Sequence, residues 1–189
     1  MRVQMAFICL ALCCALNFGS FAFPMDSKKK EAAFLFSGVP YFHRFTKDDQ
    51  QEYTPSGQED LKAWNDMVTI HYYRKVKDGE ALAATASAVL ENYKAAKGVV
   101  LRTDSVPRTK DKPAEHLVVV VFGRPEFIEV AFARFRMHDG VGTSVIYSHR
   151  IYGKKTGNEM SAWLKKNGPA TENNLMKWDA MPKQPRASK

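Results

Sequence analysis

Histidine is the side chain best suited to acid–base and metal chemistry, and all five histidines of the 189-residue chain lie after residue 42: His43, His71, His116, His138 and His149. Zinc sites favour spacings such as H-x-x-x-H and H-E-x-x-H, which place two imidazoles on one face of a helix. None of the five histidines stands at such a spacing. Motifs for a serine nucleophile or a phosphate-binding glycine loop are missing too. The sequence therefore predicts no metal site and no cofactor.

Two of the histidines, His43 and His149, each precede an arginine near the expected end of a strand. A hydrolase acting on envelope material would need these two imidazoles to meet an acid such as Glu129, with Glu115 and His116 as further partners. The alternative is that alternating strands simply place polar residues on one face. The sequence leaves both interpretations open, and it favours a protein without catalysis.

A local excess of positive charge marks the C-terminal part of the chain. The whole chain carries 28 Lys and Arg against 20 Asp and Glu, and positions 150–189 hold nine of the basic but only three of the acidic residues. This excess favours contact with an anionic envelope component or a membrane surface, and the alternative is a solvated helix face. No nucleic-acid-binding motif is present, so no nucleic-acid partner is expected. The candidate anion-binding residues are Lys154, Lys155, Lys165, Lys166 and Lys177.

The first 22 residues have the features of a secretory signal peptide. Positions 5–16 form an apolar run, and small residues at 20 and 22 suit cleavage before Phe23. An uncleaved anchor, or a lipoprotein acylated at Cys13 or Cys14, is the alternative. We therefore expect an exported protein, either periplasmic or secreted.

All three cysteines lie inside this N-terminal segment, at positions 9, 13 and 14. If the segment is removed, the mature protein has no thiol. A disulfide, a cysteine-ligated zinc site and a cysteine nucleophile are then excluded. Packing alone must stabilise the fold.

Composition and length indicate one globular domain. Hydrophobic residues make up 45% and charged residues 25% of the chain, which excludes a disordered, collagen-like or polytopic membrane protein. We expect a flexible leader at 23–30, a single domain at 31–181 and a basic disordered tail at 182–189.

Hydrophobic periodicity predicts strands that pair in an antiparallel sheet. Residues 46–60 are polar and contain Pro55 and Gly57, which favours a loop. A helix begins after the N-cap residue Asp78 and ends before Gly98, which suits the C′ position. A capping-box match at 156–159 starts a second helix, which Gly168-Pro169 separates from a third helix at 170–181. Strands are predicted at 33–36, 40–45, 64–73, 99–101, 117–122, 127–137 and 141–152.

The predicted class is therefore α+β: an antiparallel sheet of about six to seven strands, covered by a long helix and a C-terminal helix pair. The last two strands carry the most specific prediction. Asp139-Gly140 suits a two-residue type I′ turn, which places Glu129 opposite Arg150 and Val130 opposite His149. This register also gathers small residues on one face, where a helix could approach closely: Ala131, Ala133, Gly142, Ser144 and Ser148.

The order of elements supplies a resemblance. A strand group containing Trp64 and the Met67-Val68-Thr69-Ile70 stretch is followed by one long helix, a strand meander and C-terminal helices. This order resembles the PsbP/Mog1/DcrB-type fold over nearly the whole mature chain. The resemblance implies an accessory, binding or periplasmic protein that is mostly non-catalytic, and it carries over no functional residue.

The leading hypothesis is an exported, non-catalytic binding or accessory protein whose partner is an unknown protein or an anionic envelope component. The alternatives are the envelope-acting hydrolase and a peripheral membrane-surface protein that binds through the basic C-terminal helices. Aromatic residues in the first third of the chain either line a binding groove or belong to the core: Phe34, Phe36, Tyr41, Phe42 and Phe45.

Overall fold

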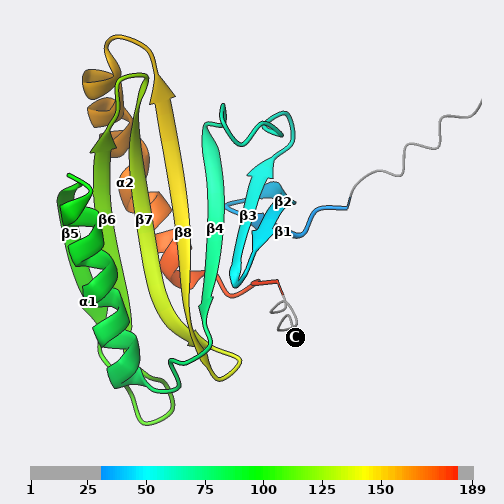
Figure 1. Cartoon of the computed structure of the whole chain (residues 1–189), viewed down its shortest axis with the longest axis vertical. Coiled ribbons are helices and arrows are strands. Elements are labelled where there is room, and N and C mark those ends of the chain that lie inside the picture. The colour runs from blue at the N-terminus through cyan, green and yellow to red at the C-terminus, as the bar shows by residue number, and fades with distance from the viewer. Residues whose placement is uncertain (1–30, 183–189) are drawn as a thin grey trace, which may run out of the picture.

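One antiparallel sheet organises residues 31–182, which are the residues that the structure, a computed structural model, describes. Its eight strands follow the order β1-β2-β3-β4-β8-β7-β6-β5 (Figure 1). The predicted signal peptide at 1–22, the leader at 23–30 and residues 183–189 of the basic tail lie outside the described residues. The elements are β1 (Phe34–Phe36), β2 (Val39–Lys47), β3 (Gln50–Pro55), β4 (Asp66–Tyr73), α1 (Gly79–Ala95), β5 (Val99–Val106), β6 (Glu115–Gly123), β7 (Phe127–His138), β8 (Val141–Tyr152) and α2 (Thr156–Lys177).

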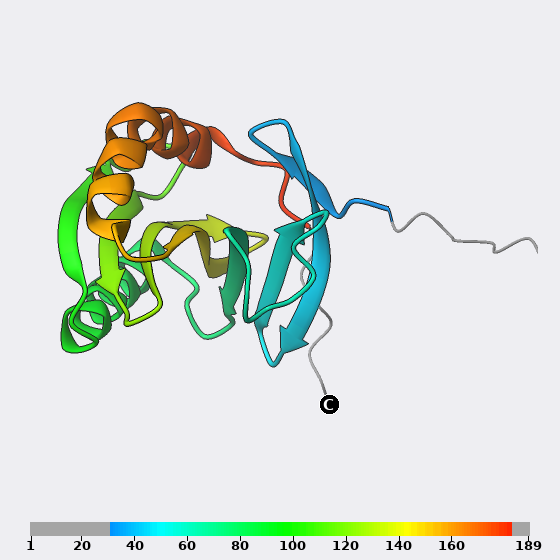
Figure 2. The same cartoon turned by 90° about the horizontal axis from the view of Figure 1, so that it is seen from above.

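The two helices pack on opposite faces of the sheet (Figure 2). Helix α1 contacts β6, β7 and β8, and α2 contacts β7 and β8 from the other side. Because successive side chains of a strand point to opposite faces, each face has its own core. The α1 face buries Leu82, Ala86 and Phe135, whereas the α2 face buries a larger set that includes Phe132 and Leu175. The predicted α+β class is confirmed.

The β7–β8 hairpin has the predicted register. His138 pairs with Val141, Val130 with His149 and Glu129 with Arg150. Asp139 and Gly140 both have positive φ, 47° and 74°, as a two-residue type I′ loop requires. Since the turn dipeptide and the strand alternation are both local signals, the sequence alone determines this hairpin.

Small residues of the hairpin lie under α1 and the loop before it, as the register predicts. Gly142 donates its backbone N–H to the carbonyl oxygen of Val76 at 2.8 Å. A Cβ atom at Gly142 would stand only 2.7 Å from Cβ of Val76. Because Gly142 has no side chain, the loop that contains Val76 can pass close to the sheet.

Two strand predictions need correction, and the first of them raises the strand count from seven to eight. The segment predicted as a loop at 46–60 contains β3, because Tyr53 and Thr54 are buried although their neighbours are polar. The strand predicted at 99–101 continues to Val106 as β5. Most of β5 is exposed at the edge of the sheet, so a buried apolar face does not mark its length in the sequence.

The predicted C-terminal helix pair is a single helix, α2, which continues through Pro169. An interior proline costs about 3 kcal/mol, because it removes one hydrogen bond and crowds the preceding turn. Packing offsets this cost: Met160 before the proline and Leu175 after it are both buried against the same core. Tertiary contacts therefore outweigh the local breaking signal.

The ends of the helices confirm one capping prediction and correct two. Asp78 accepts a hydrogen bond from the backbone N–H of Ala81, as predicted for an N-cap. At the other end of α1, Lys97 rather than Gly98 occupies C′ with a φ of 64°, and Gly98 N donates to the carbonyl of Tyr93 in a Schellman motif. The N-cap residue of α2 is Lys155, one residue before the predicted capping box.

Candidate functional site

The three residues that a hydrolase would need do not meet in the structure. Glu129 and His149 lie on opposite faces of the sheet, because His149 pairs with Val130, the neighbour of Glu129. His43 lies on β2, where its ring contacts Tyr53 and its Nε2 lies 2.6 Å from Oγ1 of Thr46. Strands β3 and β4 separate β2 from β8 in the sheet. This geometry forms no catalytic triad from His43, His149 and Glu129.

Glu129 instead belongs to an ion pair on the α1 face. Arg150 Nε donates to Glu129 at 2.8 Å, and both side chains are less than one-fifth exposed. The guanidinium carbon of Arg150 lies 3.8 Å from the centre of the Trp64 ring and 4.2 Å from that of Phe127. Arg150 is thus held between two aromatic rings, and the cluster joins the segment before β4 to β7 and β8.

The five candidate anion-binding lysines are exposed but do not form one patch. Lys154 and Lys155 precede α2, whereas Lys177 is its last residue, about 33 Å along a helix of this length. Lys155, Lys166 and Lys177 share one stripe of the helix, and Glu159 lies on the same stripe. Within residues 31–182, no helix is long and apolar enough to span a bilayer.

The arrangement that does bring together polar groups from several elements is a pocket of about 250 Å³ on the α2 face, called here the Asp66 pocket. The β1–β2 turn, β2, β4, β8 and α2 all contribute to it, and Figure 2 shows the β1–β2 end of the sheet curling toward the side on which α2 lies. Its lining residues are Phe36, Ser37, Val39, Tyr41, Pro55, Asp66, Tyr147, Trp163, Asn167 and Thr171.

The carboxylate of Asp66 is the only group among these lining residues that is charged at neutral pH. Its Oδ1 accepts a hydrogen bond from the Tyr147 hydroxyl at 2.7 Å and lies 2.9 Å from Nδ1 of His149. The His149 ring stacks on Trp163 of α2, with ring centres 4.2 Å apart. Oδ2 has one distant donor, Nε2 of Gln58 at 3.5 Å. Two donors therefore fix one carboxylate oxygen, and the other keeps capacity to accept.

These donors keep the carboxylate ionised. Burial raises the pKa of Asp66, but the hydrogen bonds from His149 and Tyr147 outweigh burial and leave the pKa below its usual value. Burial, and secondarily the charge of Asp66, raises the pKa of Tyr41 and of Tyr147. Both tyrosines therefore stay neutral beside a charged aspartate. An ionised carboxylate only accepts hydrogen bonds, so Nδ1 of His149 carries a proton.

Contacts with α2 hold the β1–β2 turn over the pocket. Ser37 and Gly38 form the two-residue turn, with φ values of 50° and 79°. Asn174 donates to Oγ of Ser37 at 3.0 Å, and the indole N–H of Trp178 donates to the carbonyl of Leu35 at 2.9 Å. The turn and α2 are thereby joined, so the pocket has fixed walls on both sides.

Of the five aromatic residues predicted to line a groove or belong to the core, three are in the core, and two, Phe42 and Phe45, are in neither the core nor the pocket. Phe34, Phe36 and Tyr41 are at least 93% buried, and Phe36 and Tyr41 also line the pocket. Phe45 is 39% exposed and belongs to neither group.

Sequence reasoning missed Asp66, and one signal could have found it. Val68, Ile70 and Tyr72 form the buried register of β4, and Asp66 stands two residues before Val68 in that same register. A carboxylate in a buried strand register needs partners, which marks it for attention. Tyr147 and Trp163 carry no comparable signal, because both fit a hydrophobic core.

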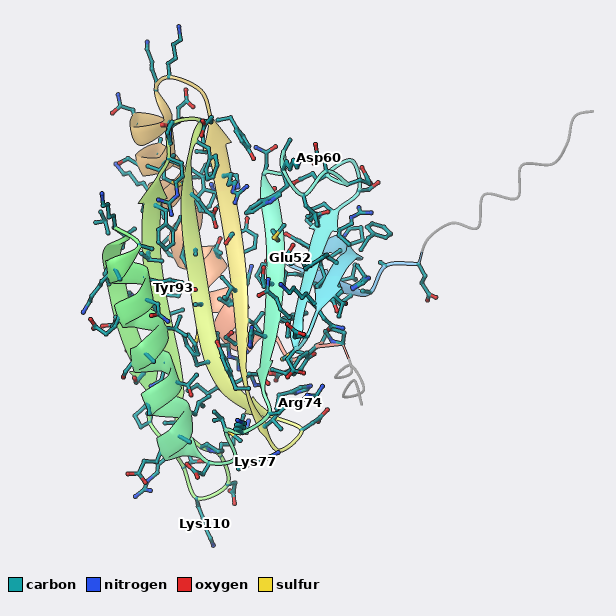
Figure 3. All side chains as sticks on the ribbon, in the orientation of Figure 1. Glu52, Asp60, Arg74, Lys77, Tyr93 and Lys110 are labelled. Carbon is teal, nitrogen blue, oxygen red and sulfur yellow. The ribbon has the colours of Figure 1, made fainter. Side chains whose placement is uncertain are left out.

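Two other hollows are larger than the Asp66 pocket, but the charged side chains that line them are exposed or, in the case of Glu172, paired with Arg102. One, of about 720 Å³, lies between the start of α1 and the loop at 108–114, from which Lys110 projects away from the sheet (Figure 3). The other, of about 420 Å³, separates α2 from β5 and is lined mainly by apolar side chains. Volume alone therefore does not identify the site.

No group of three or more His, Cys, Asp or Glu side chains within residues 31–182 is arranged to hold a metal ion.

The fold and the site together define an α+β protein with one curled antiparallel sheet and a small acidic pocket between the sheet and α2. A protein-family model matches residues 34–179, and the chain belongs to that family. No curated protein sequence matches the chain.

Comparison with solved structures finds similar chains at low sequence identity. The Ran-binding protein Mog1p of Saccharomyces cerevisiae is 18% identical, with a TM-score of 0.44 over 74% of this chain and 84% of that one. A mutant of Mog1 is 16% identical, with a TM-score of 0.40 over 77% of this chain and 88% of that one. Mog1 is one of the proteins whose fold the order of elements in the sequence resembles.

Proposed function

We propose that this protein is a non-catalytic binding protein that holds a small ligand, or one side chain of a larger partner, in the Asp66 pocket. One observation carries this proposal: an ionised carboxylate faces a pocket of about 250 Å³ while one of its oxygens is incompletely hydrogen-bonded. A partly buried charge without its full set of partners is costly, so a ligand that supplies a donor gains binding energy there.

Two polar groups at the pocket, His149 and Ser37, already have partners within the protein, and this favours binding over catalysis. The proton of His149 Nδ1 is directed at Asp66, and Trp163 covers a face of the ring. Ser37 accepts a hydrogen bond from Asn174. These contacts position the pocket walls, and they are typical of a preorganised binding site.

Export of the protein from the cytoplasm is also part of this proposal. The apolar run at 5–16 and the small residues at 20 and 22 support export to a periplasm or the cell exterior. N-terminal sequencing of the protein purified from its native host should begin at Phe23. An intact Met1 would contradict cleavage, although it would leave the pocket proposal untouched.

A fragment screen followed by NMR tests the pocket directly. Backbone and indole resonances of ¹⁵N-labelled protein should shift at Ser37, Trp163 and Asn167 when fragments of mixed charge are added. The variant Asp66→Asn should lose the fragments that contact the carboxylate. Glu129→Gln is the matched control, because Glu129 is also a largely buried carboxylate paired across strands, but on the opposite face. Fragment binding confined to other surfaces would contradict the proposal.

A further inference from the structure

We propose that the group recognised in the Asp66 pocket is a cation: an alkylammonium or guanidinium group on a short apolar stem. This inference rests on the proposed binding function and specifies its ligand. The same chemistry is supplied by a free small amine and by a lysine or arginine side chain of a partner protein.

The first argument is charge. Asp66 contributes one negative charge to the pocket lining, and the two lining tyrosines stay neutral. A ligand carboxylate or phosphate would meet repulsion from a carboxylate that is 28% exposed and screened less than a surface group. A cation would instead be attracted to the carboxylate of Asp66.

The second argument is hydrogen-bonding capacity. Oδ1 of Asp66 already has Tyr147 and His149 as partners, whereas Oδ2 has only the distant amide of Gln58. A carboxylate oxygen accepts about two hydrogen bonds, so Oδ2 has room for a ligand donor. Donors that carry a positive charge make shorter and stronger bonds to carboxylates than neutral donors do.

The third argument concerns the walls and the size of the pocket. Phe36, Tyr41 and Trp163 line it from the sheet and from α2. Aromatic rings favour cations close to their faces and also accommodate an apolar stem. A volume of about 250 Å³ equals that of roughly eight water molecules, which suits a four-carbon stem with its head group.

A matched set of four-carbon probes tests this inference on the unmodified protein. We would titrate n-butylammonium, n-butylguanidinium, 1-butanol and butyrate into ¹⁵N-labelled protein and follow Ser37, Trp163 and Asn167 by NMR. Both cations should bind at least tenfold more tightly than 1-butanol, and butyrate should bind most weakly. The preference for cations should fall in Asp66→Asn and persist in Glu129→Gln. Because the probe ranking is measured on the wild-type protein, it holds even if a variant folds poorly.

The outcomes separate the ligand class from the pocket itself. If 1-butanol or butyrate binds at these residues as tightly as the cations, the cation inference is overturned while the binding pocket stands. If no probe shifts these residues, and the mixed fragments also fail to do so, the pocket proposal falls as well. N-acetyl-lysine methylamide distinguishes the two sources: binding as tight as that of n-butylammonium indicates a partner's side chain, and much weaker binding indicates a free amine. Either result supports a cationic ligand.

Discussion

The guanidinium group of Arg134 donates a hydrogen bond to the backbone carbonyl of Trp178 at 2.7 Å, at the C-terminal end of α2. The same Nη1 donates to the carbonyl of Leu175, and Nε donates to Glu115 at 2.7 Å. Arg134 is only 3% exposed. A buried cation on β7 thus adds a donor to carbonyl groups at the C-terminal end of α2, and it holds the helix that forms one wall of the Asp66 pocket.

Replacing Arg134 should therefore destabilise the whole domain. Arg134→Met keeps much of the volume but removes the nearest donor of Glu115 and of the Leu175 and Trp178 carbonyls, so we expect a loss of about 3 kcal/mol in the free energy of unfolding. Urea denaturation measures this change. Lys94→Met is the control, because Lys94 and its partner Glu91 are both at least half exposed, and this variant should unfold at the wild-type urea concentration. Equal stability of the two variants would contradict the role given to Arg134.

A methyl group at Gly142 should also be costly. Its Cβ would collide with the side chain of Val76, which belongs to a loop bonded to the Gly142 backbone. We expect Gly142→Ala to lower the free energy of unfolding by about 1–3 kcal/mol, the usual cost of overpacking. In Gly123→Ala the new Cβ meets no atom within 4 Å, so thermal denaturation should show little change there. A wild-type melting temperature for Gly142→Ala would show that the loop moves freely.

Lys97 offers a stabilising substitution. It follows α1 with a φ of 64°, a left-handed conformation that costs a non-glycine residue about 1–2 kcal/mol. Lys97→Gly removes that strain and should raise the free energy of unfolding by about 1 kcal/mol. Lys94→Gly, three residues earlier within the helix, should lower it by about the same amount. Denaturant midpoints for both variants test the assignment, and destabilisation by Lys97→Gly would refute it.

Asp66 should make stability depend on pH in the acid range. Its pKa is lower in the folded chain than the value of about 3.9 expected when unfolded. The ionised carboxylate therefore contributes its full stabilisation above about pH 4, and this contribution is lost as the pH falls through the folded pKa. The stability difference between wild type and Asp66→Asn should accordingly shrink below about pH 4. Unfolding curves at pH 7 and pH 3 measure it, and a constant difference would exclude this linkage.

Local signals account for the parts of the fold that the sequence predicts correctly. The type I′ turn at Asp139-Gly140, the alternation of β7 and β8 and the N-cap at Asp78 each depend on a few neighbouring residues. The failures involve distant contacts. The polar strand β3 exists because Tyr53 packs on the α2 face, and α2 passes Pro169 because both of its halves bury side chains on the sheet.

The candidate site lies beyond local prediction for the same reason. His149 was predicted as a site residue, but its partners Asp66 and Trp163 come from β4 and α2. Glu129, its expected partner, belongs to the opposite face, which the predicted register of β7 and β8 already implies. The lysine-rich segment is exposed as expected, but the length of α2 spreads its charges. Composition reveals such an excess of charge but not its distribution in space.

The pairing of β4 with β8 has a consequence for the order of folding. Asp66 and His149 are 83 positions apart, whereas two residues join β7 to β8. Closing a long loop costs more conformational entropy than closing a hairpin, so the β7–β8 ribbon can form before β4 joins it. In that order of events, the carboxylate meets its donors only after β4 has joined the ribbon. A nascent or partly folded chain has no Asp66 pocket, and ligand capture is confined to molecules that have completed the sheet.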